Sequence, residues 1–297
     1  MSLYAISLSS LLAHVVIGLA KGMIFVLLAL GLSLIFGLLG IVNFAHGSLF
    51  VLGAFFGFFV LGQTGSFWLA LAVGPVLVGL VGLAIEKLLI QPLAGRRSAD
   101  DSLLITFGFS LVVIDAVRMI WGKRGVEFNP PPGFAGALDL GWTLFPTYRL
   151  LVIGITLLVV IALWLFLVRT DLGLVIRAGT REPLMTRALG IRLGRIRFLV
   201  FGLGAALAGL AGVLSGPLRQ VSPEMGVSTV IEAFVVVVVG GMGSISGAVL
   251  AGLLLGQVVS LTEMVAPTMG QIAIFLAMAV VLLVRPTGLF GEAGFME

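Results

Sequence analysis

The chain has 297 residues, of which 60% are hydrophobic and only 10% are charged, and its formal net charge is +4. Because charged residues make up about a quarter of an ordinary soluble domain, this composition excludes such a domain and indicates a membrane protein. The positive charge does not indicate nucleic-acid binding, because the basic residues gather at the ends of apolar runs, as membrane insertion requires. The absence of cysteine excludes disulfide bonds and thiolate metal sites.

Long apolar runs follow one another along the chain, and most approach the roughly 20 residues that a helix needs to cross a membrane. In chain order, the expected spans are 11–39, 48–61, 67–89, 103–121, 150–168, 198–216, 228–239, 248–261 and 271–284. The run at 228–239 is short, so about eight or nine transmembrane helices are expected. Nine transmembrane helices would place the N-terminus on the outer side of the membrane. We predict an all-α polytopic membrane protein, with residues 1–297 forming a single transmembrane domain.

The segment 170–197, together with Arg169 before it, has the largest positive excess of any hydrophilic segment. It contains seven arginines against only Asp171 and Glu182. Short loops rich in arginine stay on the cytoplasmic side of a membrane, so this segment defines the orientation of the spans around it. A second inner loop is expected around Arg96 and Arg97. The proline-containing segment 122–148 is expected to be an outer loop.

A short helix is expected within this cytoplasmic segment. Thr180 would be its N-cap, an acid and a proline follow in the first turn, and a Gly-Ile pair at 190–191 would end it. Leu184, Met185 and Leu189 recur at spacings close to one helical face. A cytoplasmic helix with an exposed apolar face needs a surface to dock against. That surface could be a soluble partner protein or, alternatively, the lipid headgroups.

Two glycine-rich breaks interrupt the apolar runs at matching places, residues 40–47 and 240–247. In each half, an apolar run, a break, a small-residue helix and a further span follow in the same order. This order predicts two pseudo-repeated halves whose matching segments cross the membrane in the same direction. Discontinuous hydrophobic segments at matching positions point to a transport site. Non-helical backbone at membrane depth survives only where protein or a water-filled cavity satisfies it. Both breaks should therefore face a pathway, although close helix packing through small residues is the alternative.

A few polar side chains within the apolar runs need an explanation, because charge inside a membrane is costly. Asn43 and His46 could hydrogen-bond a solute or cap the helix ends at the first break. Glu232 could meet a substrate ammonium group, an arginine of a partner, or solvent. Asp115 and Arg118, three residues apart, are expected to pair.

Four motifs carry a resemblance to a known family, and they lie at residues 40–47 (GIVNFAHG), 177–191 (RAGTREPLMTRALGI), 239–244 (VGGMGS) and 285–288 (RPTG). In this order they resemble the membrane permease of branched-chain amino acid ABC importers, in its H-type subunit, with urea and amide importers as near relatives. The resemblance implies a multi-pass protein of the bacterial inner membrane without a cofactor. It implies as partners a second homologous permease, two ATP-binding subunits and a periplasmic solute-binding protein.

In such permeases the segment that resembles residues 181–191 is a coupling helix that sits in a cleft of the ATPase. The residues expected at this ATPase contact are Arg177, Arg181, Glu182, Pro183, Leu184, Arg187, Ala188, Leu189 and Gly190. The residues expected along the substrate pathway are Asn43, His46, Gly47, Glu232, Gly240, Gly241, Gly243 and Ser244.

The chain does not contain the residues for ATP hydrolysis or other catalysis. Its Gly122-Lys123 pair is followed by Arg124 rather than by serine or threonine, so no P-loop is present. The two histidines, His14 and His46, have no metal-ligand spacing. We therefore expect a non-enzymatic permease subunit that moves branched-chain or related amino acids. The alternatives are a urea or short-amide permease of the same family and a stand-alone secondary transporter, against which the shortage of charges within the spans counts.

Overall fold

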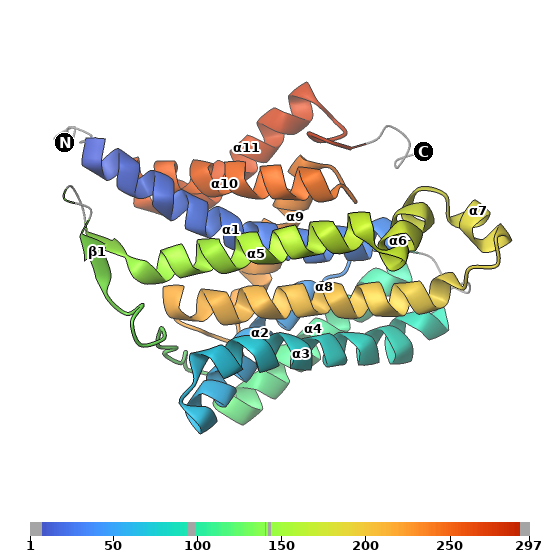
Figure 1. Cartoon of the computed structure of the whole chain (residues 1–297), viewed down its shortest axis with the longest axis horizontal. Coiled ribbons are helices and arrows are strands. Elements are labelled where there is room, and N and C mark those ends of the chain that lie inside the picture. The colour runs from blue at the N-terminus through green and yellow to red at the C-terminus, as the bar shows by residue number, and fades with distance from the viewer. Residues whose placement is uncertain (1–7, 94–98, 140, 142–143, 292–297) are drawn as a thin grey trace.

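The computed structural model describes residues 8–93, 99–139, 141 and 144–291 (Figure 1). The predicted inner residues Arg96 and Arg97 lie outside this part of the chain. The described residues form eleven α-helices and a two-stranded antiparallel sheet. The helices are α1 (Leu8–Leu39), α2 (Ala45–Thr64), α3 (Phe67–Ile85), α4 (Ala99–Trp121), α5 (Thr147–Arg169), α6 (Asp171–Arg181), α7 (Pro183–Ala188), α8 (Leu193–Ser215), α9 (Met225–Gly240), α10 (Ile245–Val265) and α11 (Gly270–Val284). The strands are β1 (Ala137–Asp139) and β2 (Leu144–Pro146).

Eight of the helical segments in the described part are long and apolar enough to cross a membrane. They are α1 to α5, α8, α10 and α11, where α3 is extended by a π-helical turn (Glu86–Ile90) and α8 and α11 by short 3₁₀ turns. This confirms the predicted all-α polytopic membrane protein. Figure 1 shows the start of α1 and strand β1 at one end of the bundle, with α6 and α7 at the opposite end. The predicted outer loop and the arginine-rich segment therefore lie on opposite sides.

The short helix α9 begins beside the start of α2, where Gly226 packs on Gly47, and ends at the second break. Glu224, just before its first residue, accepts a hydrogen bond of 3.0 Å from Arg118 at the outer end of α4. Beyond its last residue, Gly243 lies against Gly37 in the last turns of α1. A helix of 16 residues extends about 24 Å, nearly the thickness of the hydrocarbon core. Helix α9 is shorter than the eight helices that could span a membrane, so the described part has eight candidate spans and one shorter apolar helix.

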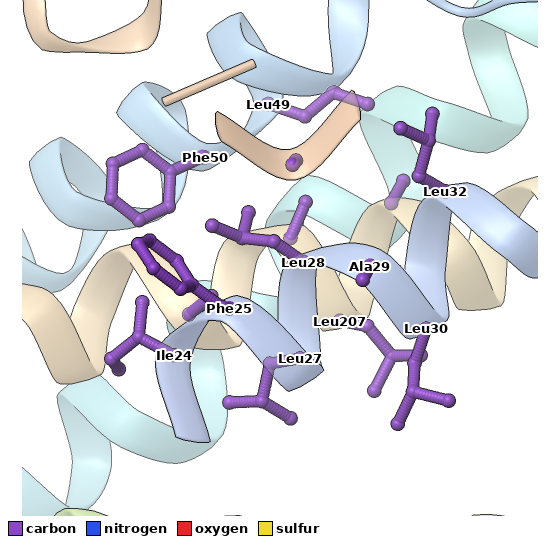
Figure 2. Close-up of a cluster of buried hydrophobic side chains, with 14 of the residues drawn as sticks. Ile24, Phe25, Leu27, Leu28, Ala29, Leu30, Leu32, Leu49, Phe50 and Leu207 are labelled. Atoms are coloured by element: carbon purple, nitrogen blue, oxygen red, sulfur yellow. The ribbon is translucent and has the colours of Figure 1, made fainter. Parts of the chain in front are cut away.

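Helix α1 is at the centre of the bundle. In its most apolar window 83% of the residues are buried, against 11% in the last span, so α11 lies at the periphery. Figure 2 shows side chains of α1 from Ile24 to Leu32 packed beside Leu49 and Phe50 of α2 and Leu207 of α8. The exposed apolar side chains of the peripheral helices are the surface expected to face lipid.

Glycines allow several pairs of helices to approach at backbone distance. A Cβ atom placed on Gly53 of α2 would lie 2.2 Å from the carbonyl oxygen of Gly209 in α8. A Cβ atom on Gly256 of α10 would lie 2.4 Å from Gly22 of α1. Small residues at helix crossings allow this close van der Waals contact, which drives helix association in lipid. The element order α1, break, α2, α3 recurs as α9, break, α10, α11, as the pseudo-repeat predicted.

Candidate transport and coupling sites

The first break consists of the non-helical residues between α1 and α2. Helix α1 ends at Gly40, whose φ of +67° is favoured by glycine and whose N–H donates to the Phe36 carbonyl at 2.8 Å. Asn43 is fully buried, and its Oδ1 accepts a hydrogen bond of 3.0 Å from the N–H of Ala45, the first residue of α2. Its side chain thus satisfies one of the N–H groups that a helix start leaves free.

His46 is also fully buried, in the first turn of α2. Its Nε2 donates to the carbonyl oxygen of Leu28 in α1 at 3.0 Å, which fixes the start of α2 beside the middle of α1. Gly47 follows, and a Cβ atom placed on it would lie 2.2 Å from the carbonyl oxygen of Gly226 in α9. Asn43 thus caps the start of α2, whereas the hydrogen bond of His46 goes to the middle of α1 and caps no helix end. Contact of either side chain with a solute stays a prediction. Gly47 provides a close packing contact between α2 and α9.

The second break lies between α9 and α10. Gly241 and Gly243 have φ angles of +100° and +80°, so the turn needs residues without a Cβ atom. Ser244 caps α10, because its Oγ accepts a hydrogen bond of 3.1 Å from the N–H of Gly247. Gly240 packs directly on Gly247, where a Cβ atom on Gly240 would lie 2.5 Å from the carbonyl carbon of Gly247.

The C-terminal motif covers this second break. The N–H groups of Leu289 and Phe290 donate to the carbonyls of Val239 and Gly240 at 2.8 and 3.0 Å. These carbonyls belong to the last turn of α9, where no further helical N–H groups follow to bond them. The structure therefore brings together two of the four motifs, residues 239–244 and 285–288.

The arginine-rich segment 170–197 forms two helices rather than one, and the prediction that a helix begins at Thr180 is wrong. Helix α6 begins after Thr170, whose Oγ1 accepts from the N–H of Gly173 at 3.1 Å. Thr180 is in the last turn of α6, and its hydroxyl donates to the Ile176 carbonyl at 2.9 Å. The residue before a proline is disfavoured in the helical conformation, and Glu182 accordingly has φ −132° and ψ 69°. Helix α7 therefore starts at Pro183.

Helix α7 ends at Ala188, and Gly190 of the predicted Gly-Ile pair closes the turn that follows it. Gly190 has φ +83°, its N–H donates to the Arg187 carbonyl at 2.9 Å, and the N–H of Ile191 donates to the Thr186 carbonyl at 3.4 Å. This is the hydrogen-bond pattern of a Schellman motif. Thr186 faces inward and is 2% exposed.

The other side of α7 presents an apolar surface. Leu184, Met185 and Leu189 are 80%, 66% and 79% exposed, respectively, and we call these three side chains the α7 apolar face. Arg187 and Ala188 on the same helix are also exposed, as are Arg177 and Arg181 in α6. The coupling residues expected from the sequence thus lie together at the inner end of the bundle.

Charged side chains gather in one half of the bundle, and the sequence had singled out Glu232, Asp115 and Arg118 among them. Glu232 is partly buried halfway along α9. Lys21 of α1 forms an ion pair with Glu263 of α10, and Arg219 donates a hydrogen bond of 2.8 Å to Thr229 of α9. The only sequence signal for Lys21 was that it interrupts an apolar run. Asp115 and Arg118 pair at 2.9 Å, as predicted.

Known proteins similar to this chain are transport permeases. The model of the family "Branched-chain amino acid transport system / permease component" matches residues 14–285. The permease BraD of Pseudomonas aeruginosa is 31% identical over 95% of this chain and 96% of its own length. LivH of Escherichia coli K12 is 30% identical over 93% of this chain and 94% of its own length.

A second kind of permease from the same system also matches. LivM of Escherichia coli K12 is 30% identical over 78% of this chain and 60% of its own length. All three are described as high-affinity branched-chain amino acid transport system permease proteins. The matched family model covers nearly the whole described bundle, from the first span to the end of the last. The chain belongs to the family of branched-chain amino acid transport system permease components.

Proposed function

We propose that this chain is the LivH-type permease subunit of a bacterial inner-membrane ABC importer for branched-chain amino acids. Its near full-length similarity to BraD and LivH supports this assignment. The single structural observation that carries it is the α7 apolar face, exposed at the end of the bundle that holds the arginine-rich segment. An apolar surface in water is stabilised by docking, and the arginine-rich segment supports a cytoplasmic position for it.

In this proposal two separate ATP-binding subunits drive transport, and α7 docks into a cleft of one of them. Movement of α7 would reach the membrane through α6, because Thr180 of α6 packs against Gly37 of α1, and Gly37 packs against Gly243 of the second break. A transporter that alternates between two conformations needs such a contact between the ATPase and the gate. A second homologous permease, of which LivM is the known example, completes the membrane part. A periplasmic binding protein delivers the solute at the outer end.

Reconstitution tests the proposal. The chain is placed in liposomes with its partner permease, its two ATP-binding subunits and the solute-binding protein, and uptake of labelled leucine is measured with and without ATP. We expect uptake only with the complete set and ATP. Uptake by this chain alone, driven by an ion gradient, would instead identify a secondary transporter. Uptake of urea or acetamide in place of leucine would assign the chain to the urea and amide branch.

A further inference from the structure

Helix α9 carries a carboxylate at membrane depth. Glu232 is the eighth of its 16 residues, so it lies about 11 Å from the outer end of the helix. Among the described residues, no hydrogen bond or ion pair is formed by its side chain. Ionisable groups within a membrane face the bundle interior or a water-filled path rather than lipid. By this rule, the partly exposed side of α9 that holds Glu232 is the side expected to face a pathway.

Arg219 lies one helical turn outward from this carboxylate. Its Nη2 donates to Thr229 Oγ1 at 2.8 Å, and its guanidinium lies 5.1 Å from the ring centroid of Phe50 in α2. Thr229 precedes Glu232 by three residues on α9, so their side chains are neighbours about 5 Å apart along the helix. The Arg219 guanidinium acts electrostatically on Glu232 without forming an ion pair with it. Among the ion pairs of the described residues, none joins these two opposite charges.

A second pair of charged side chains lies near the site. Lys21 and Glu263 form an ion pair that joins α1 to α10, and both act electrostatically on Glu232. Arg219 and Glu232 together are neutral, and Glu263 of the neighbouring ion pair also interacts electrostatically with Arg149 of α5. A neutral site with separated opposite charges matches a zwitterion better than it matches a cation, an anion or an uncharged amide. The exposed apolar side chain of Ile231, next to Glu232, offers a contact for a branched aliphatic group.

We propose that Arg219 and Glu232 form a zwitterion-binding site on the pathway side of α9, in which Arg219 binds the α-carboxylate and Glu232 the α-ammonium group of an amino acid. This inference rests on the proposed function and deepens it by naming the groups that select the solute. A charge-assisted hydrogen bond at each end would align the solute along the helix, because carboxylates suit the planar guanidinium fork. Urea and short amides lack both charges and would lose both contacts.

The test uses the complete reconstituted importer and measures ATP-driven leucine uptake. We expect Glu232→Gln and Arg219→Gln each to lower uptake about tenfold or more, the loss expected on removing one charge-assisted hydrogen bond. The double variant Arg219→Gln/Glu232→Gln should be at least as impaired as either single variant. If the two side chains only neutralised each other and did not bind the solute, removing both charges would restore uptake, because no unpaired charge would remain. Restored uptake would therefore overturn the proposal.

The Lys21–Glu263 pair supplies a matched control, for which the double variant is expected to be less impaired than the single variants. Lys21→Gln/Glu263→Gln removes an existing ion pair as a unit and should transport better than either of its single variants.

Glu232→Asp keeps the carboxylate and should retain more uptake than Glu232→Gln, provided that equal amounts of assembled complex are compared. Loss of assembly in Glu232→Gln but not in Arg219→Gln would assign Glu232 to the contact with the second permease and refute the site. A wild-type importer that transports urea but no leucine would refute the proposed function itself, before any variant is compared.

Discussion

Thr180 of α6 packs against Gly37 of α1, so that a Cβ atom placed on Gly37 would lie 3.2 Å from the Thr180 methyl carbon. Gly37 also faces Gly243, to whose Cα the same Cβ atom would lie at 3.5 Å. One glycine thus contacts both the cytoplasmic helix pair and the second break. Because packed contacts of this kind are rigid, a displacement of α6 should also displace the second break.

Substitution Gly37→Val tests this contact. Two added methyl groups would push Thr180 and Gly243 away from α1, and overpacking of this kind typically costs about 1–3 kcal/mol. We expect ATP hydrolysis by the assembled importer to continue while leucine uptake per ATP falls several-fold. Gly108→Val is the control, since no atom lies within 4 Å of a Cβ atom at Gly108. Full coupling in Gly37→Val would exclude this contact as a route between α6 and the break.

Substitution Gly53→Ala tests the close contact between α2 and α8. The new Cβ atom would lie 2.2 Å from the Gly209 carbonyl oxygen, a backbone atom that cannot move without shifting the helix. We expect a lower thermal unfolding midpoint in detergent, with a loss of stability of about 1–3 kcal/mol. Gly62→Ala in the same helix meets open space and should leave the midpoint unchanged or raise it. Equal midpoints for the two variants would show that α2 can move away from α8 without cost.

The spans were predictable because length and hydropathy alone determine them. For example, the apolar run 67–89 became α3 with its π-helical extension, ending at Ile90. The break before Asn43 was visible in its glycine and polar residues. Helix α6 was missed because it is only 11 residues long and the Thr-Arg-Glu-Pro sequence at its end resembles a helix start. Only the conformation of Glu182 shows where one helix ends and the next begins.

The contacts among the charged side chains Lys21, Glu263, Arg219 and Glu232 were less predictable. Lys21 and Glu263 are separated by 242 positions in the sequence and pair only because α1 packs along α10. Arg219 lies just beyond α8, where an arginine at the end of a span needs no further explanation. Its contact with Thr229 depends on how the chain turns between α8 and α9. Long-range side-chain partners of this kind follow from tertiary packing, which hydrophobic periodicity does not reveal.

Asn43 offers a test of capping against solute binding. Asn43→Ala removes the acceptor for the Ala45 N–H, and we expect a loss of stability of about 1 kcal/mol. Asn43→Ser keeps a hydroxyl oxygen that can accept from the same N–H, so it should recover part of that stability. Thermal unfolding and leucine uptake are measured for both. If uptake falls equally in both variants while stability is unchanged, Asn43 acts on the solute rather than on the helix.

Charge reversal at Arg187 tests the electrostatics of the coupling segment. Arg187 is exposed on α7 and repels Arg197 at the start of α8, so Arg187→Glu should not destabilise the isolated chain. We expect normal membrane insertion together with loss of the coupling between ATP hydrolysis and leucine uptake. Arg169→Glu, at the end of α5 and outside α7, is the control. Normal coupling in Arg187→Glu would contradict a role of this arginine in docking.

The α7 apolar face should contribute most of the binding free energy of docking, because burying its exposed apolar side chains removes them from water. Leu189→Asp places a charge where an apolar side chain is 79% exposed, so the fold of the chain is unaffected. Within a docked cleft the same carboxylate would be desolvated, which should cost about 2 kcal/mol or more and weaken ATPase binding over tenfold. Retention of the ATP-binding subunits on the purified permease measures this loss. Leu172→Asp makes the same exchange at an exposed leucine of α6, and equal retention of the ATPase by both variants would place the docking surface outside α7.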